Sequence, residues 1–388
     1  MFSSRFHWDT RPNRLTEALE ARRLAGAPVL DLTESNPTRA GFEYPREVMI
    51  AFADQRMLVY EPSPAGALDA RQAVSAYYAA RGLGVHEERI LLTASTSEAY
   101  SYLFKLLADP GDHVLVPRPS YPLFEFLANM ESVEARSYPL VYHGGWSIDL
   151  DALAGAIDDR TRAVVLVNPN NPTGSYVKRA ELARLERLAA ARGIALISDE
   201  VFADYAFAPD DERAATLEGV RDCLWFSMSG LSKIAGLPQM KLGWIVAGGP
   251  PELRSEAYGK LEWIADTYLS VGTPVQRAAA RLLEAGETVR LQIRERTAAN
   301  LAFARQALAG SAAGVLDAEG GWYLVVQVPR IRGEEQWALD LLMDEGVLVQ
   351  PGFFYDFESE AFLVVSLLTA PGAFREGIVR LRNMVARG

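Results

Sequence analysis

The stretch RAVVLVNPNNPTG, at residues 162–174, decides the fold that we expect for this chain. Its first half is an apolar run with the length of a β-strand that is buried on both faces. Its second half has the composition of a turn, rich in asparagine and proline. In open α/β sheets, ligands bind beyond the carboxyl ends of the strands. The stretch therefore predicts a central strand and, directly after it, a loop at the ligand-binding edge of the sheet.

Apolar runs of similar length lie on both sides of this strand. They begin at Arg89, His113, Ile194, Leu224 and Leu242, and a weaker run lies near Val133. Helical patterns separate several of them, at residues 97–108, 121–130, 149–157 and 179–192. Strands that alternate with helices in this way form mostly parallel sheets. We therefore expect an α/β fold in which helices cover a mostly parallel, seven-stranded sheet.

The chain changes character after residue 274. A long helical pattern at residues 275–308 precedes three short apolar runs, GWYLVVQV, GVLVQPG and FLVVSLL. This order indicates a second, smaller α+β domain. The expected division is an N-terminal segment packing with the small domain (1–45), a large α/β domain (46–275) and the small α+β domain (276–388).

The composition argues against several classes of function. The net charge of −11 disfavours a nucleic-acid partner. One cysteine and four scattered histidines give no metal-ligand pattern, so we expect no metal. No stretch reaches the ~18 apolar residues of a membrane span, and the first residues lack the apolar run of a signal peptide, so we expect a cytoplasmic protein. A dinucleotide fingerprint also fails, because Gly82-Leu83-Gly84 is followed by Glu87 where a third glycine is needed.

Polar side chains follow five of the expected strands. They are Ser95, Thr96 and Ser97 at the start of a helix, then Tyr121, Asn171, Asp199, and Ser229 with Lys233. Because the carboxyl ends of parallel strands share one edge of a sheet, we expect these side chains to lie together.

This set matches the requirements of pyridoxal phosphate. The cofactor's aldehyde needs a lysine for its Schiff base, and its pyridine nitrogen needs a buried carboxylate to stay protonated. Lys233 and Asp199 are the candidates. The phenolic oxygen needs hydrogen-bond donors, the ring face an aromatic partner, and the phosphate a helix N-terminus, hydroxyls and a cation. The candidates are Asn171 for the oxygen, Tyr121 for the ring, and Ser95, Thr96, Ser97, Ser229 and Lys241 for the phosphate.

Each candidate has an ordinary explanation when it is taken alone. A lysine after a strand is usually solvated, and Asp199 could simply end a strand and cap the next helix. Ser95, Thr96 and Ser97 form a common N-cap cluster. The prediction of a cofactor site therefore rests on the five segments occurring together, each at the end of a strand.

At this point the sequence resembles the class I and II aminotransferases, members of the fold-type-I group of pyridoxal-phosphate enzymes. The resemblance covers nearly the whole chain and includes the motifs LTESNP, YEPSPAG, GTPVQRAA, GGWYLVV and VLVQPG, which begin at residues 32, 60, 272, 320 and 347. It implies a homodimer with active sites at the subunit interface. Tyr60 would then reach the phosphate bound by the neighbouring subunit, and Thr273 would lie close by. The resemblance also implies that Lys233 moves a proton between substrate and cofactor.

Three departures from the family pattern concern the cofactor. Phe202 stands where a tyrosine usually donates to the phenolic oxygen. Lys241 replaces an arginine that usually binds the phosphate, and it would act as a point charge with less directional hydrogen bonding. Gly230 replaces a serine, so Ser229 or Ser232 would have to supply that hydroxyl.

A fourth departure concerns the substrate. The family places an arginine on a small-domain strand to bind the substrate α-carboxylate, and the alignment puts Val364 at that position. A carboxylate buried there without a partner would cost roughly several kcal/mol. Either another cation binds it, for which Arg39 is a candidate, or the substrate group is not a carboxylate. Ser35 replaces a substrate-facing glycine in the same N-terminal segment as Arg39.

The sequence therefore predicts an aminotransferase that moves an amino group between an amino acid or related amine and a keto acid. The alternative is a lyase, cyclase, racemase or decarboxylase on the same scaffold, because Lys233 and Asp199 would serve all these reactions. A cofactor-binding transcriptional regulator is disfavoured, because fewer than 40 residues precede the family-like segment and the net charge is −11.

Overall fold

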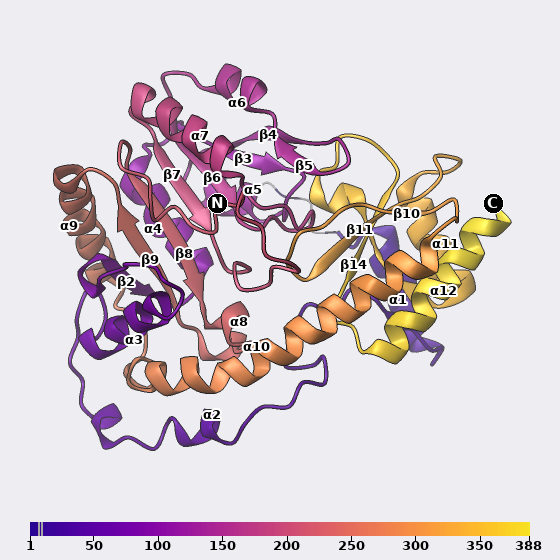
Figure 1. The fold of residues 1–388 in the computed structure, drawn as a ribbon, viewed down its shortest axis with the longest axis horizontal. Helices are drawn as coiled ribbons and strands as arrows, with labels where there is room; N and C mark the ends of the chain where they lie inside the picture. Colours follow the sequence, from indigo (N-terminus) through magenta and orange to yellow (C-terminus); the bar gives the residue numbers. More distant parts are fainter. Residues whose placement is uncertain (7, 9–10) are drawn as a thin grey trace.

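The computed structural model describes residues 1–6, 8 and 11–388. An eight-stranded sheet with the order β2-β9-β8-β7-β6-β3-β4-β5 dominates one side of the molecule (Figure 1). Its strands are β2 (Ile90–Thr93), β3 (His113–Arg118), β4 (Glu134–Tyr142), β5 (Trp146–Ile148), β6 (Thr161–Val167), β7 (Ala195–Asp199), β8 (Trp225–Gly230) and β9 (Gly243–Gly248).

All seven strands that the sequence predicts are present in this sheet. In β6, Ala163 and Val165 pack on one face of the sheet and Val164 and Leu166 on the other, which explains the unbroken apolar run. The sequence did not predict the eighth strand, β5. It has only three residues and pairs antiparallel with the end of β4 across the turn at residues 143–145, so it is too short to produce an apolar run of its own.

The sheet is mostly parallel, as expected. Strands β4, β3, β6, β7 and β8 run in one direction. Strand β9 runs antiparallel between β2 and β8, and β5 runs antiparallel at the opposite edge. The α/β class predicted from the alternating pattern is therefore confirmed.

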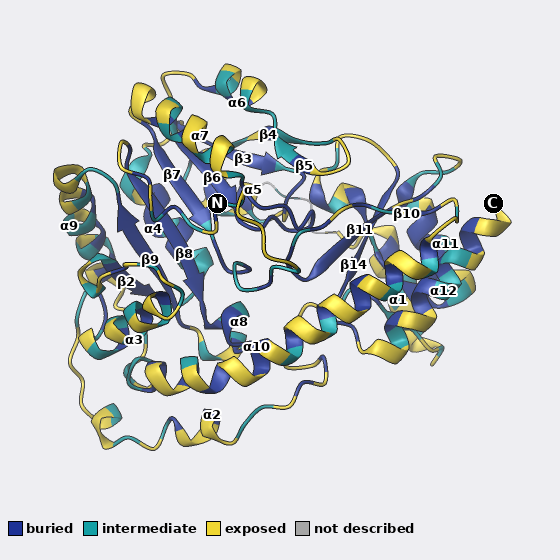
Figure 2. Cartoon of the chain, viewed as in Figure 1, coloured by how far each residue is buried: buried dark blue, intermediate teal, exposed yellow. Residues whose placement is uncertain are grey.

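Helices cover both faces of this sheet. One face packs against α4 (Thr96–Leu107), α5 (Phe124–Met130) and α9 (Pro251–Tyr268). The other packs against α3 (Leu68–Ala79), α6 (Leu150–Ala156), α7 (Arg179–Arg192), α8 (Leu231–Ile234) and the first half of α10 (Thr273–Leu308). Figure 2 shows buried central strands and helices whose outer faces are exposed. No helix in the described part of the chain is long and apolar enough to cross a membrane.

A four-stranded sheet with the order β10-β11-β14-β13 forms the other side of the molecule. Its strands are β10 (Gly314–Val315), β11 (Tyr323–Gln327), β13 (Gln350–Pro351) and β14 (Phe362–Ser366). Helices α1 (Arg14–Leu24), α11 (Glu334–Glu345) and α12 (Pro371–Arg387) pack with it. The N-terminal segment joins this side, because β1 (Leu30–Asp31) pairs in parallel with β12 (Val347–Leu348).

Helix α10 connects the two sides. Leu282 near its start belongs to the core under the large sheet, and Leu301 near its end belongs to the core of the small sheet. Between them, Val289 and Ile293 pack into a cluster that also contains Phe202 and Val364. This cluster lies next to the carboxyl edge of the large sheet, where the site described below is built. A short helix directly after the N-terminal segment, α2 (Glu47–Ile50), packs against α10 (Figure 1).

Candidate active site

The carboxyl edge of the large sheet is where the structure brings the expected segments together. The Asn168 amide donates to the Asp199 carbonyl oxygen at 2.8 Å, so the loop that follows β6 starts beside the end of β7. Asn170 Nδ2 donates to Ser120 Oγ at 3.4 Å, which joins the same loop to the segment of Tyr121. These bonds follow from the parallel register of the strands.

Lys233 lies in the short helix α8, directly after β8. Its Nζ is 4.8 Å from the ring centroid of Trp322 and 5.6 Å from that of Phe202. Burial lowers the pKa of the Lys233 amine to about 8, while the charge of Asp199 partly opposes this shift. The Tyr205 hydroxyl donates to the Lys233 carbonyl oxygen at 2.5 Å and so fixes the backbone of the lysine. About a tenth of this amine is therefore neutral, and nucleophilic, at pH 7, which is far more than for an ordinary lysine.

Asp199 ends β7 and faces the same region. Its Oδ2 accepts from the Tyr100 hydroxyl at 3.3 Å, and its Oδ1 accepts from the Val201 amide at 3.2 Å. Burial raises the pKa of Asp199 to about 6, while these two bonds and the charge of Lys233 oppose the rise. The carboxyl group is therefore mostly ionised at neutral pH, as a partner of a protonated ring nitrogen must be.

The N-terminus of α4 is the candidate phosphate site. Ser95 caps the helix, because its Oγ accepts from the Glu98 amide at 3.2 Å. Thr96 and Ser97 are half-buried in the first turn. Ser229 lies close to this turn: a Cβ at Gly243 would sit 3.1 Å from the Ser229 carbonyl oxygen and 3.2 Å from the Ser95 carbonyl carbon.

Several buried polar side-chain atoms in the described part of the chain have no hydrogen-bond partner. Two of them belong to predicted cofactor residues, Ser229 Oγ and Asn171 Oδ1. A buried polar atom without a partner is unfavourable, so the Ser229 hydroxyl marks a position where a polar ligand would be bound. The oxygen of the Asn171 side chain can only accept, so its amide nitrogen would be the donor to a phenolic oxygen. Ser229 adjoins the helix N-terminus that would hold a phosphate, and Asn171 follows the strand beside Asp199. The residues present therefore fit pyridoxal phosphate.

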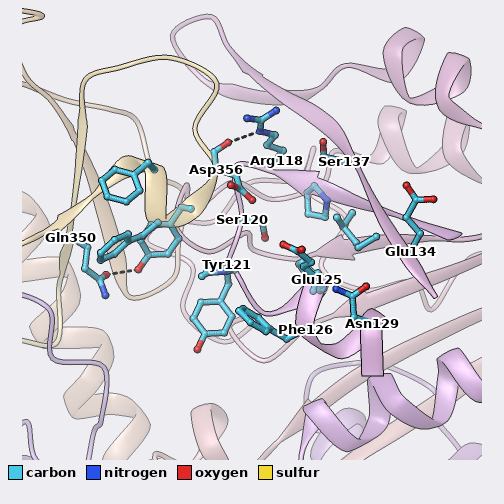
Figure 3. A pocket seen from close by; sticks show the side chains of 18 of the residues that line it. Arg118, Ser120, Tyr121, Glu125, Phe126, Asn129, Glu134, Ser137, Gln350 and Asp356 are labelled. Atoms are coloured by element: carbon cyan, nitrogen blue, oxygen red, sulfur yellow. Dashed lines mark hydrogen bonds between the residues drawn. The ribbon is translucent and has the colours of Figure 1, made fainter. Parts of the chain in front are cut away.

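Tyr121 borders a cavity of about 890 Å³ between the two sheets. Figure 3 shows Tyr121 and Phe126 on the large-sheet side of this cavity and Gln350 on the opposite side. Arg118 Nε closes one end by donating to the Asp356 carbonyl oxygen at 2.8 Å. Tyr121 is 47% exposed, so part of its side chain is accessible.

Two predicted residues lie at the surface of the described chain. Lys241 is exposed at the end of the segment between α8 and β9. Tyr60 is 73% exposed in the segment before α3. Neither residue has a recorded contact with Lys233 or Asp199. The predicted roles of Lys241 at the phosphate and of Tyr60 in a partner's site remain predictions.

The structure gives physical reasons for two of the departures from the family pattern. Phe202 is buried and packs edge-on against Trp322, with ring centroids 5.2 Å apart. A Cβ at Gly230 would lie 2.9 Å from Gly243 Cα, so the close approach of β8 and β9 leaves no room for a serine. Ser229 is the neighbouring hydroxyl that has no partner.

Val364 is fully buried on β14. Its neighbours across the small sheet are Val325 on β11 and Gln350 on β13. Gln350 Oε1 accepts from the Tyr355 hydroxyl at 2.5 Å. The two residues that pair with Val364 across the sheet are therefore neutral.

Both substrate candidates of the N-terminal segment, Ser35 and Arg39, are exposed. Ser35 hydrogen-bonds with Tyr323, which belongs to the same buried cluster as Val364, and burial raises the pKa of that tyrosine. The position of Arg39 leaves its proposed role untested.

Sequence reasoning missed two residues of this site. The Trp322 ring lies against the Lys233 amine. Trp322 belongs to the motif GGWYLVV, but the motif alone gave it no role in the site. Tyr100 hydrogen-bonds with Asp199. The one sequence feature that could have indicated this is its position one helical turn after Thr96 and Ser97, on the same side of the helix.

The chain was compared with known proteins. Residues 27–371 match the family model "Aminotransferase class I and II". A glutamate-pyruvate aminotransferase of Escherichia coli is 31% identical over 268 residues, which is 67% of this chain but only 65% of that protein. Its namesake in Haemophilus influenzae is 26% identical over 390 residues, covering 95% of this chain and 93% of that protein. An alanine aminotransferase structure from Pyrococcus furiosus shares the fold, with a TM-score of 0.89, 23% identity and full coverage of both chains. The chain belongs to the class I and II aminotransferase family.

Proposed function

We propose that this protein is a pyridoxal-phosphate-dependent aminotransferase that exchanges an amino group between an amino acid or related amine and a keto acid. The observation that carries the proposal is the placement of Lys233 and Asp199 at the same carboxyl edge of the sheet, where each charge acts on the other. Burial lowers the pKa of the lysine to about 8 and raises that of the aspartate to about 6. Opposed shifts of this kind are typical of a site prepared for chemistry. The aminotransferase activity of the relatives supports the same reaction.

Each residue has a distinct task in this proposal. When bound, pyridoxal phosphate would supply an electron sink that stabilises negative charge on the substrate α-carbon. Asp199 would hold the ring nitrogen protonated, and Asn171 would donate to the phenolic oxygen. Tyr121 would pack on the ring face. Thr96, Ser97, Ser229 and Lys241 would bind the phosphate.

Lys233 would act as the base. Once displaced from the cofactor by substrate, its neutral amine would take a proton from the substrate α-carbon and return it to the cofactor carbon. The rings of Trp322 and Phe202 are close neighbours of Nζ, and burial lowers the pKa of the amine. Burial in this position therefore raises the fraction of the amine that is neutral and can act as a base.

The substrate pocket is expected to favour groups without charge. Val364 replaces the family arginine, and the side chains paired with it, Val325 and Gln350, carry no charge. A carboxylate there would have to be held by neutral donors such as Tyr323, or by Arg39 from the N-terminal segment. This departure also supports the second candidate function, a lyase, cyclase, racemase or decarboxylase reaction on the same cofactor.

A homodimer completes the proposed site. Tyr60 is largely exposed, as a residue that serves a neighbouring subunit would be in a single chain. Thr273 lies close to Tyr60, since both line one small pocket. Tyr60 would contribute its hydroxyl to the phosphate bound by the partner.

A half-reaction assay tests the proposed reaction. The protein carrying the cofactor is mixed with single donors: amino acids, their matched amides, and simple amines. We expect the absorbance near ~420 nm to bleach with a donor and to return with a keto acid. Amides should react at least about tenfold faster than the matched acids, because a carboxylate beside Val364 has to be desolvated.

The outcomes of this assay separate the alternatives. Release of ammonia and a keto product without an acceptor would replace transamination by a lyase reaction. Free acids reacting faster than their amides would contradict the neutral pocket and point to Arg39. No bleaching with any donor would contradict transamination, because the alternative reactions return the cofactor to its aldehyde form in each turnover.

The reactivity of Lys233 should rise with pH around 8. An amine attacks an aldehyde in its neutral form, and burial lowers the Lys233 pKa from its ordinary 10.5 to about 8. Below this value the capture of pyridoxal phosphate should slow roughly tenfold per pH unit, and above it the rate should level off. Trapping with borohydride at timed intervals, followed by mass spectrometry, measures this rate. A rate that still rises tenfold between pH 9 and 10 would contradict the expected shift.

A further inference from the structure

Helix α4 contributes more to the site than its N-terminus. Thr96 and Ser97 begin this helix, and Tyr100 follows one turn later on the same side. One turn of helix rises about 5.4 Å, which is comparable to the span of a pyridine ring with its substituents. Tyr100 hydrogen-bonds with Asp199 at 3.3 Å, so the same helix faces both the phosphate end and the ring-nitrogen end of the proposed cofactor site.

The position of Tyr100 is fixed by packing. Its side chain is 3% exposed. Its ring packs edge-on against Phe124 and at a tilt against Phe104, with centroids 5.5 and 5.8 Å apart. Asp199 is the only recorded hydrogen-bond partner of the hydroxyl in the described part of the chain. Packing between α4 and α5 therefore fixes the orientation of this hydroxyl. Its hydrogen-bond partner, Asp199, belongs to β7, so the bond joins these helices to the sheet.

The two hydrogen-bond donors around Asp199 bind different oxygens of its carboxylate. Val201 N–H occupies Oδ1, the Tyr100 hydroxyl occupies Oδ2, and Lys233 is the charged group that acts on the carboxylate. A hydroxyl that donates to a carboxylate favours the ionised form. Because burial strongly raises the pKa of the Tyr100 phenol, it stays protonated as a donor over the whole working range of pH.

We propose that Tyr100 is a positioning residue that keeps Asp199 ionised and oriented toward the cofactor's ring nitrogen. The proposal rests on the proposed cofactor site but not on the overall reaction. Tyr100 does not touch the reacting atoms. Its contribution is to extend the binding of the cofactor to lower pH, because Asp199 must be ionised to pair with a protonated ring.

The test is the pH dependence of cofactor affinity in Tyr100→Phe, which keeps the ring and its packing and removes only the hydroxyl. The probe is pyridoxamine 5′-phosphate, which has the same ring and phosphate but cannot bond covalently to Lys233. We expect the variant to bind roughly three- to tenfold more weakly than the wild type at pH 6, and within about twofold at pH 8.5. The difference shrinks at high pH because Asp199 is then ionised in both proteins.

Two comparisons isolate the hydroxyl. Tyr102→Phe is the matched control, since Tyr102 is equally buried on α4 and its hydroxyl lies 3.5 Å from Ser270 Oγ, away from Asp199. It should bind the probe like the wild type at every pH. In an Asp199→Asn background, Tyr100→Phe should cause no further loss.

Three results would overturn the proposal. They are an unchanged affinity in Tyr100→Phe at pH 6, a loss of the same size at every pH, and an equal loss in the Asp199→Asn background. If pyridoxal phosphate also failed to attach to the wild type, the cofactor assignment itself would fall. Binding of the probe without any amino transfer would leave the role of Tyr100 intact while contradicting the proposed reaction.

Discussion

Replacing Lys233 with alanine should abolish amino transfer and the covalent attachment of pyridoxal phosphate. The amine is the proposed base, and positioned acid-base groups contribute roughly 10²–10⁴-fold to a rate. It is also the residue to which the proposal assigns the bond to the cofactor aldehyde, so we expect a loss of about 10³-fold or more. The variant should stay folded, because Nζ lies over the Trp322 and Phe202 rings and forms no recorded ion pair in the described part of the chain.

The measurement combines the half-reaction rate with the absorbance near ~420 nm. Lys233→Arg should lose as much as Lys233→Ala, because a guanidinium keeps the charge but neither attacks the aldehyde nor acts as a base. Lys260→Ala is the control, since Lys260 is an exposed lysine paired with Glu256 on α9. Near-normal turnover in Lys233→Ala would contradict the proposed mechanism.

Replacing Asp199 with alanine should produce the second-largest loss. Without the carboxylate, the ring nitrogen loses the charge that keeps it protonated, and the electron sink weakens. We expect the half-reaction to slow by roughly 10²–10³-fold, as when a preorganised electrostatic partner is removed. Lys233 should still bond to the aldehyde in Asp199→Ala. This variant should therefore keep the covalent attachment of the cofactor that Lys233→Ala loses.

Glu200→Gln provides a matched control for this prediction. Glu200 is also a buried carboxyl, next in sequence, but its Oε1 is bonded to the Ser227 hydroxyl at 2.7 Å and the Leu217 amide at 3.2 Å, away from the site. Burial raises its pKa to about 7. The glutamine variant should retain its half-reaction rate within about threefold, since an amide replaces the carboxyl without touching the cofactor. Similar losses in Asp199→Ala and Glu200→Gln would show that the effect is structural.

Much of the fold could be predicted because the central strands are buried on both faces. A strand such as β6 has to be apolar at every position, so its sequence differs plainly from that of an exposed element. The end of α7 at Gly193 is marked equally well, by a glycine in the left-handed conformation. Strand β5 has no comparable feature in its sequence. Its three residues form a strand because they pair with β4, and they show no apolar run of their own.

The candidate site could be predicted where residues follow strands and not where they reach in from elsewhere. Asp199 ends a buried strand, and Lys233 and Asn171 each stand a few residues after one, so topology alone places them at one edge. Tyr100 and Trp322 reach the same edge from a helix and from the small sheet. Their contacts depend on tertiary packing that no local pattern encodes.

The two residues proposed to face the substrate also differ in how far the sequence could place them. The position of Val364 followed from aligning β14 with the helix after it, and the structure adds its neutral neighbours Val325 and Gln350. Arg39 lies in an exposed segment without regular structure, where neither sequence nor fold fixes the direction of a long side chain.

The most direct test of the central claim is to locate the cofactor on the chain. The protein is saturated with pyridoxal phosphate, reduced with borohydride, digested, and mapped by mass spectrometry. We predict that the modified lysine is Lys233, with one cofactor per chain. Modification of a different lysine, or of none, would contradict the account.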